Sequence, residues 1–207
     1  MNSVLIQKLN STVISESSIK HSTNDLSDEL LIARFIDGSQ ASYELLVMRY
    51  KKRIFEFIYF QIKQNNHDAE DLTQDVFIEL YRKAESFRKE SKFSTYLFSI
   101  AKNIVLNYFR ATSRRFSFSL VFSKERETKV TDLQEQFVNE KDQQQVYSVI
   151  NSLSPDERQI IYLCDRENFS YTQISEILNI KMGTVRSRLS TTRNKVIKKL
   201  RESNHEM

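Results

Sequence analysis

The clearest indication of the fold of this chain is its C-terminal segment SYTQISEILNIKMGTVRSRLSTTRNKVIKKL, residues 170–200. Ser170 is followed three residues later by Gln173, a spacing typical of a capping box at the start of a helix. Asn179 is a residue type that tolerates the left-handed conformation of a tight turn, and a basic amphipathic pattern begins near Met182. The stretch therefore predicts two helices joined by a short turn, a helix-turn-helix.

The rest of the chain also favours helices. Ser154-Pro155-Asp156-Glu157 places Ser at an N-cap, Pro at the first helical position and Glu at the third, which predicts another helix start. The 207 residues include only two Gly and one Pro, whereas hairpins and Gly-rich phosphate loops need residues that reach positive φ. We predict an all-α fold of two small helical domains joined by a flexible linker, the C-terminal one a helix-turn-helix.

Apolar periodicity sets the expected boundaries of these parts. Helical patterns are expected from Leu26 to a stop at Gly38, through Leu45 to Ile58, from Ala69 to Glu85, and from Ser94 to about Thr112. In the third pattern the predicted core side carries Leu72, Val76, Phe77, Leu80, Tyr81 and Ala84. The expected organisation is a disordered tail at 1–24, a first domain at 25–113, a linker at 114–141 and a second domain at 142–203.

Acidic and basic residues are segregated along the chain, which predicts two kinds of partner. No carboxylate occurs between Glu90 and Glu125, or from Met182 to Arg201, although the net charge is only +4. The predicted third helix instead carries three carboxylates at four-residue steps beside an outward-facing Ile78: Asp71, Asp75 and Glu79. An exposed apolar residue among carboxylates predicts a protein contact.

The predicted fourth helix has a polar stripe along one face, at steps of three or four residues. Its ring could stack on an unpaired base, its amides could bind base edges and its guanidinium groups could bind phosphates, which is the chemistry of single-strand capture. An ordinary solvated helix face is the alternative. The stripe consists of Tyr96, Ser99, Asn103, Asn107, Arg110 and Arg114.

The basic helix after Met182 has the pattern of a helix that reads the major groove, with short polar groups and Arg near its start. A basic helix that is merely exposed to solvent is the alternative. The inward side is predicted to carry Val185, Leu189, Thr192, Val196 and Leu200. The outward side carries Ser187, Ser190, Thr191, Asn194 and Lys198, flanked by Arg186, Arg188 and Lys195.

Several other functions are disfavoured. The carboxylates at Asp71 and Asp75 could hold a metal in a nuclease, but we see no His on that face. Cys164 lies in an apolar run and is expected to fill the core, and a single Cys cannot form an internal disulfide. With no run of about 18 apolar residues and no export signal, we expect a cytoplasmic protein without membrane insertion, enzymatic activity or cofactor.

Several motifs together resemble the sigma-70 family of RNA polymerase sigma factors. Residues 69–77, AEDLTQDVF, are similar to the family's polymerase-binding segment. Residues 93–97, FSTYL, running into IAKN at 100–103, resemble its promoter-melting helix. Three further segments resemble the family's promoter-binding C-terminal domain: SLSP at 152–155, YTQISEI at 171–177 and GTVRSRL at 183–189. The conserved middle regions of larger members are missing, which points to the extracytoplasmic-function (ECF) group.

The resemblance implies an alternative sigma factor that binds core RNA polymerase and directs promoter recognition. The first domain would dock on a coiled coil of the largest catalytic subunit through Asp71, Gln74, Asp75, Ile78 and Glu79. It would capture the melted minus-ten strand with the Tyr96 to Arg114 stripe. The second domain would read the duplex minus-thirty-five element through Thr184, Arg186, Ser187, Arg188, Ser190, Thr191, Asn194 and Lys198.

Two departures from the family pattern limit what can be transferred. Tyr96 stands where Trp is common, and Thr191 stands where many relatives carry Arg, so the promoter sequence does not transfer. An anti-sigma protein as a further partner is left open. A stand-alone helix-turn-helix regulator is the alternative function, although it leaves the N-terminal domain unexplained.

Overall fold

The computed structural model describes residues 26–63, 65–88, 90–122 and 148–205. Within these ranges every regular element is a helix and no strand occurs, so the predicted all-α class is confirmed. The predicted tail at 1–24 and most of the predicted linker lie outside the described residues.

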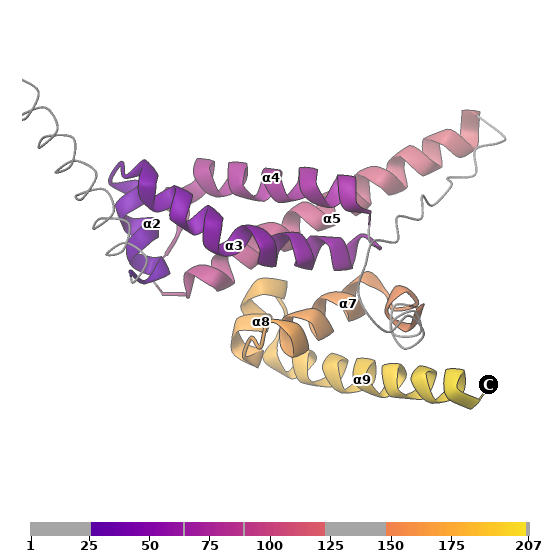
Figure 1. Ribbon diagram of the computed structural model, residues 1–207. Coiled ribbons are helices and arrows are strands. Elements are labelled where there is room, and N and C mark those ends of the chain that lie inside the picture. Colours follow the sequence, from indigo (N-terminus) through magenta and orange to yellow (C-terminus); the bar gives the residue numbers. More distant parts are fainter. Residues whose placement is uncertain (1–25, 64, 89, 123–147, 206–207) are drawn as a thin grey trace, which may run out of the picture.

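The described residues of the N-terminal half form four α-helices (Figure 1). They are α2 (Asp28–Ile36), α3 (Gln40–Gln61), α4 (Asn66–Lys83) and α5 (Phe93–Phe122), with a 3-10 turn η1 (Ala84–Ser86) after α4. The C-terminal half contains α7 (Pro155–Ile161), a π-helical turn η2 (Tyr162–Arg166), α8 (Tyr171–Leu178) and α9 (Met182–His205).

The helix ends follow the local signals in the sequence. The capping boxes of Ser154 with Glu157 and of Ser170 with Gln173 are both formed. Asn179 ends α8 at φ 53° and ψ 51°, in the left-handed region, and Gly38 follows α2 at φ +99°. These predicted starts and stops are confirmed because each depends only on residues within one turn of the helix end.

Helix α5 is longer than predicted. It continues to Phe122 instead of ending near Thr112, and so extends into the expected linker. Residues 113–122 contain no Gly or Pro to stop a helix. The apolar periodicity weakens after Ser113, which predicted a linker there, but this weakening did not mark the end of the helix.

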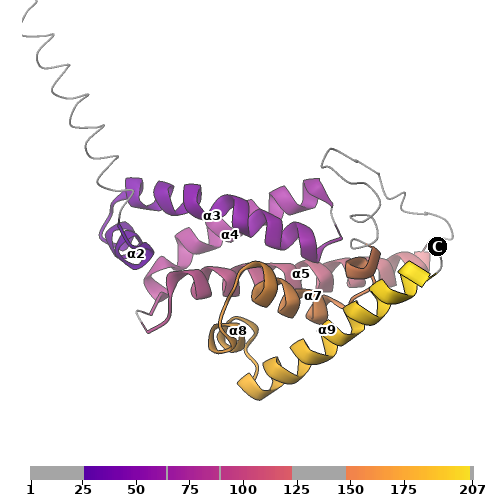
Figure 2. The ribbon, with the colours of Figure 1, turned by 60° about the horizontal axis from the view of Figure 1, so that its bottom comes forward.

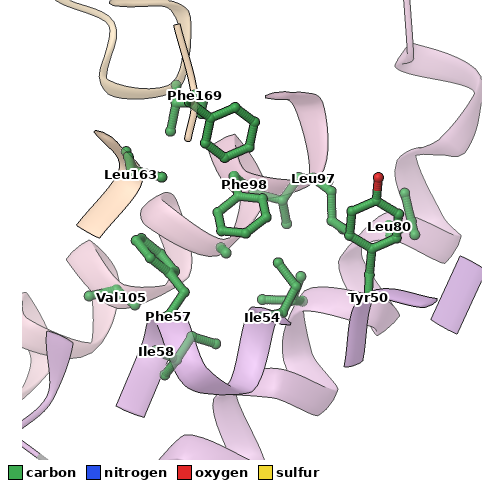
Figure 3. Close-up of a cluster of buried hydrophobic side chains, with 14 of the residues drawn as sticks. Tyr50, Ile54, Phe57, Ile58, Leu80, Leu97, Phe98, Val105, Leu163 and Phe169 are labelled. Atoms are coloured by element: carbon green, nitrogen blue, oxygen red, sulfur yellow. The ribbon is translucent and has the colours of Figure 1, made fainter. Parts of the chain in front are cut away.

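The core of the N-terminal half lies where α3 and α5 face each other (Figure 3). Ile54 and Phe57 of α3 are fully buried against Leu97 and Phe98 of α5, and Leu80 of α4 is also fully buried. Tyr81 was predicted on this core side, but 52% of it is exposed. Its ring lies at the edge of the bundle instead, 5.1 Å from the ring of Phe35.

The C-terminal helices pack on one side of this bundle, and α4 lies on the other (Figures 1 and 2). α8 contacts α5, and α7 contacts α3, while α4 contacts α3, α5 and η1. Leu163 and Phe169 from the C-terminal half belong to the same hydrophobic cluster as Phe57 and Phe98 (Figure 3). The two halves therefore share one continuous core.

Candidate functional site

Helix α4 presents an acidic, partly apolar face to solvent. Asp71, Gln74 and Asp75 are exposed, and Ile78 is 47% exposed, as its position in the pattern predicted. Glu79 is half-buried, and one of its carboxylate oxygens lies 2.6 Å from the Lys83 ammonium. Because the buried side chains of α4 point to the opposite side, this acidic face of α4 is open to a partner.

One histidine also lies on the acidic face. His67 Nδ1 is 3.4 Å from a carboxylate oxygen of Asp71, one turn further along the helix. The prediction that this face carries no His was therefore wrong, because the four-residue spacing of His67 and Asp71 places them side by side. Even so, the described part of the chain contains no group of three or more His, Cys, Asp or Glu that could hold a metal ion.

Tyr96, at the start of the polar stripe on α5, is held in place by the connection from α4. Its hydroxyl donates a hydrogen bond to the Lys83 carbonyl oxygen at 2.8 Å and lies 2.9 Å from Ser86 Oγ. Its ring centroid lies 5.4 Å from that of Phe87. Sequence reasoning missed these supports, because Ser86 and Phe87 lie in the connection after α4 and belong to no periodic pattern.

The other members of the stripe follow Tyr96 down the same side of α5. The Ser99 hydroxyl donates back to the Tyr96 carbonyl oxygen at 2.7 Å. The stripe spans 18 residue steps, or about 27 Å at 1.5 Å per residue. The structure thus brings the predicted residues together on one face, with the four beyond Ser99 exposed: Asn103, Asn107, Arg110 and Arg114.

Helix α9 separates its two sides as predicted. Val185, Leu189 and Thr192 are at most 1% exposed, whereas Val196 and Leu200 are half-buried. Thr184 is half-buried, and its carbonyl oxygen accepts a hydrogen bond from the Ser187 hydroxyl at 3.2 Å. The remaining predicted DNA-binding residues are exposed: Arg186, Ser187, Arg188, Ser190, Thr191, Asn194 and Lys198.

Most cations of α9 form ion pairs with carboxylates. Arg188 pairs with Asp156 at 3.2 Å, and Lys198 pairs with Glu202 at 3.7 Å. Lys195, predicted to flank the outward face, is half-buried and donates to both carboxylate oxygens of Glu157 at 2.8 and 3.0 Å. That prediction is corrected: Lys195 ties α9 to the capping box of α7.

This tie changes the ionisation of Glu157. Burial alone would raise the pKa of its carboxyl group. Hydrogen bonds from the Lys195 ammonium and from the Ser154 backbone outweigh burial and hold the pKa below its usual range. The carboxylate of the capping box is thus stabilised in its charged form, which keeps α7 and α9 together.

Cys164 lies at the edge of the core. Its thiol is half-buried and lies 3.5 Å from a guanidinium nitrogen of Arg193, which also pairs with Asp165. Burial raises the pKa of the Cys164 thiol, so the less nucleophilic protonated form is favoured. These features fit the predicted packing role at the margin of the core.

Comparisons with known proteins decide the family. Residues 46–115 match Sigma-70 region 2, and residues 143–196 match Sigma-70, region 4. The chain is 32% identical over 186 residues to the ECF RNA polymerase sigma-E factor of Escherichia coli K12, covering 86% of this chain and 96% of that relative. The chain belongs to the ECF group of sigma-70 family sigma factors.

Similarity to other sigma factors supports the same family. The chain is 32% identical to the sigma-E factor of Haemophilus influenzae, covering 84% of this chain and 96% of the relative. The sigma factor RpoE of Bartonella quintana, solved in complex with the anti-sigma factor NepR, aligns with a TM-score of 0.65 and 25% identity over 77% of this chain and 96% of RpoE. CnrH, solved with the cytosolic domain of CnrY, shares the fold at a TM-score of 0.62 and 19% identity, over 84% of this chain and 97% of CnrH.

Membership of the family accounts for both halves of the molecule. As an alternative sigma factor, the protein directs promoter recognition and transcription initiation, with core RNA polymerase and promoter DNA as partners. A stand-alone regulator would not explain region 2, which carries α4 and the stripe on α5. Among the described helices, none is long and apolar enough to span a membrane.

Proposed function

We propose that three separate faces of this sigma factor carry out three steps of initiation. The acidic face of α4 binds core polymerase, the outward face of α9 reads the minus-thirty-five duplex, and the stripe on α5 captures the melted minus-ten strand. The observation that carries this proposal is the arrangement of the stripe, in which a firmly held ring is followed by exposed amides and guanidinium groups.

The acidic face of α4 has the composition of a protein-binding surface. Asp71 and Asp75 supply negative charge, and Ile78 supplies apolar area that gains free energy when a partner covers it. Opposite charge on the partner would speed association and fix the orientation of docking. We place Gln74 and Glu79 in the same contact because they lie on this face.

The outward face of α9 suits a duplex. Ser187 and Ser190 are short enough for the backbone of the helix to approach base edges, and the exposed Arg186 can reach guanine or phosphate. Lys198 lies three turns further on, where a cation binds phosphate without regard to sequence. Base reading is therefore assigned to the first half of α9.

The stripe on α5 suits a single strand. An aromatic ring can stack on any unpaired base, and such a stack contributes about 1 to 3 kcal/mol. The hydrogen bond from Tyr96 to the Lys83 carbonyl oxygen holds the ring before the base arrives, which lowers the entropy lost on binding. Asn103 and Asn107 would then bind base edges, and Arg110 and Arg114 would bind phosphates.

The proposal extends to regulation and location. RpoE of Bartonella quintana was solved with an anti-sigma factor, and it aligns with this chain over 96% of its own length. We infer that this chain has an anti-sigma partner as well. We further infer that it acts in the cytoplasm, where polymerase and promoter DNA are found, and that it has no catalytic activity of its own.

Runoff transcription with purified core polymerase on genomic promoter fragments tests the whole assignment. We expect transcripts only when both core polymerase and this protein are present, because a sigma factor acts through polymerase. Gel-shift assays of the protein alone supply the comparison. Tight, sequence-specific duplex binding without polymerase, together with no runoff transcript, would favour the stand-alone regulator instead.

A further inference from the structure

Two tyrosines of α5 bind α4 at its opposite ends. At the C-terminal end of α4, the Tyr96 hydroxyl donates to the carbonyl oxygen of Lys83, the last residue of that helix. In the first turn of α4, the Tyr108 hydroxyl donates to a carboxylate oxygen of Asp68 at 2.5 Å. The two tyrosines are about 18 Å apart along α5, at 1.5 Å per residue. The helix with the acidic face and the helix with the stripe are therefore joined at two separate points.

The Asp68 carboxylate is held in place by the N-cap of α4. It lies in the first turn, where the helix dipole favours a negative charge. The Asn65 side chain accepts a hydrogen bond from the Asp68 backbone N–H at 3.2 Å and donates one to the same carboxylate oxygen that Tyr108 reaches, at 3.0 Å. The other carboxylate oxygen lies 4.0 Å from Nδ1 of His67. The cap thus orients the oxygen that accepts the Tyr108 hydroxyl.

The hydrophobic packing of α5 ends before the far half of the stripe, which consists of Asn107, Arg110 and Arg114. Val105 is fully buried, but every residue from 106 to 114 is half-buried or exposed. In Figure 1, α5 continues past the start of α4. The far half of the stripe therefore lies beyond the last core residue of this part of α5, and it needs another restraint to keep its orientation.

Tyr108 lies where that restraint is needed. It follows Asn107 directly and precedes Arg110 by two residues. The side chains of Thr112 and Arg114 donate to carbonyl oxygens of α5 itself, whereas the Tyr108 hydroxyl reaches another helix. The bond to α4 therefore restrains both the position and the rotation of α5 beside the side chains proposed to bind the strand.

We propose that Asp68 and Tyr108 are positioning residues for strand capture, and that their hydrogen bond holds the far half of the stripe in the orientation in which it meets the melted strand. The inference rests on the proposed function of the stripe. Both residues act through the stripe and not on the DNA itself. A restrained Asn107 loses less conformational entropy when a base arrives, so the bond raises the affinity of the stripe for the unpaired strand. Because Asp68 lies within one turn of Asp71, the same bond joins the docking face to the strand-binding face.

The first experiment measures the motion of α5 in the free protein. A nitroxide spin label on Thr112→Cys, in a Cys164→Ala background, reports on the far half of the stripe, and a label on Lys102→Cys reports on the packed part of α5. Tyr108→Phe removes only the hydroxyl that binds α4. It should raise the mobile fraction of the label at position 112 roughly twofold or more and leave the label at position 102 unchanged.

Tyr43→Phe is the matched control. Its hydroxyl also ends on α4, at the carbonyl oxygen of Phe77 at 2.9 Å, but it comes from α3. This variant loses a hydrogen bond to the same helix without releasing α5, so it should leave the label on Thr112→Cys and promoter opening unchanged. An equal gain of mobility in Tyr43→Phe and Tyr108→Phe would indicate general loosening of the bundle and overturn the proposal.

The second experiment measures promoter opening at saturating polymerase, through the permanganate reactivity of unpaired thymines. Tyr108→Phe should bind core polymerase like wild type and open duplex promoters roughly three- to tenfold less. Asp68→Ala should show the same loss, whereas Asp68→Asn keeps an acceptor oxygen and should retain most of the opening. An Asp68→Asn variant as defective as Asp68→Ala would rule out this hydrogen bond as the positioning contact.

A double-mutant cycle with Asn107→Ala separates positioning from a loss of stability. If the Tyr108 hydroxyl acts through Asn107, the two variants combined should open promoters better than the product of their single losses predicts. Combined losses equal to that product would contradict the positioning role.

The outcomes separate the positioning role from the proposed function. If Asn107→Ala reduces opening while Tyr108→Phe matches wild type in opening and in label mobility, the positioning role is overturned and the stripe stands. If Asn107→Ala and Tyr96→Ala both open promoters like wild type, the proposed function of the stripe fails instead. The spin label would still decide in that case whether the hydrogen bond restrains α5.

Discussion

The two helices proposed to meet DNA use their cations differently. On α9, Arg188, Arg193, Lys195 and Lys198 all form ion pairs with carboxylates. On α5, Arg110 and Arg114 form no ion pair with any described residue, and no carboxylate occurs between Glu90 and Glu125. The difference suggests that Arg193 and Lys195 hold α9 against η2 and α7, whereas Arg110 and Arg114 on α5 remain available for a strand that appears only after melting.

The largest effect is expected from changes in the acidic face of α4. A sigma factor that cannot dock on core polymerase would lose the promoter contacts of both α5 and α9. Asp75→Arg or Ile78→Glu should weaken core binding by about 2 to 5 kcal/mol, since each puts charge of the wrong sign, or an unpaired charge, into the docking face of α4. Pull-downs with core polymerase measure this, and circular dichroism checks the fold. Glu44→Arg, on the exposed side of α3, is the matched control. Unchanged affinity in both variants would remove the docking assignment.

The second effect should be confined to α5. Tyr96→Ala should form normal polymerase complexes but open duplex promoters roughly 5- to 150-fold less, because one base stack contributes about 1 to 3 kcal/mol. Permanganate reactivity of unpaired thymines measures the opening. A template already unpaired at the minus-ten bases should recover part of the loss.

Asn103→Ala should behave like Tyr96→Ala, to a smaller extent. Thr112→Ala, an exposed change on α5 outside the stripe, should melt the promoter like wild type. If both stripe variants showed wild-type thymine reactivity at limiting polymerase, the stripe would be only a solvated helix face.

The third effect should be confined to α9. Arg186→Ala should cost about 1 to 3 kcal/mol of discrimination at the upstream element, if the guanidinium binds a base edge. Ser187→Ala and Ser190→Ala should also alter dependence on that element, whereas Lys198→Ala should weaken binding evenly across sequences. Transcription from matched and scrambled upstream elements separates these cases. Equal losses on both templates for Arg186 and Lys198 variants would contradict the reading role of α9.

The smallest effect concerns the rigidity of α9. The pKa of Glu157 is lowered in the folded protein, so its pair with Lys195 contributes stability above the usual carboxyl pKa, about 4.3. This stability is lost as the pH falls through the folded-state pKa. Glu157→Gln should lower the free energy of unfolding by at most about 1 kcal/mol at pH 7, because the pair is partly exposed. Denaturant unfolding at pH 7 and pH 3 would show whether the difference disappears in acid.

Local features of the fold could be predicted from the sequence. Both capping boxes, the left-handed Asn179 and the buried side of α9 depend on residues within a few positions of one another. The faces of α4 and α5 were predictable for the same reason, since helical spacing alone assigns Ile78 and Tyr96 to their sides. The assigned roles of these residues stay predictions.

Contacts between distant segments could not be predicted. The Lys195–Glu157 pair joins residues 38 positions apart, and the Arg53–Glu167 pair joins residues 114 positions apart. The helical spacing of residues in the sequence does not indicate which residues so far apart will pair. The hydrogen bond from Tyr96 to the Lys83 carbonyl oxygen could not be predicted either, because every residue has a backbone acceptor whatever its side chain.

The π-helical turn η2 restricts how the length of this chain can vary. A π-turn holds one residue more than an α-turn, and here it lies between Arg158, which reaches α3, and the rings that meet α3 and α5. Because the π-turn already holds one extra residue, loss of one residue from Tyr162–Arg166 can be absorbed by conversion to an α-turn, whereas insertion of a further residue would rotate everything after it by about 100° about the helix axis. Phe169 and α8 would then face away from α5. Single-residue insertions that a surface loop would tolerate should therefore be selected against within these five residues.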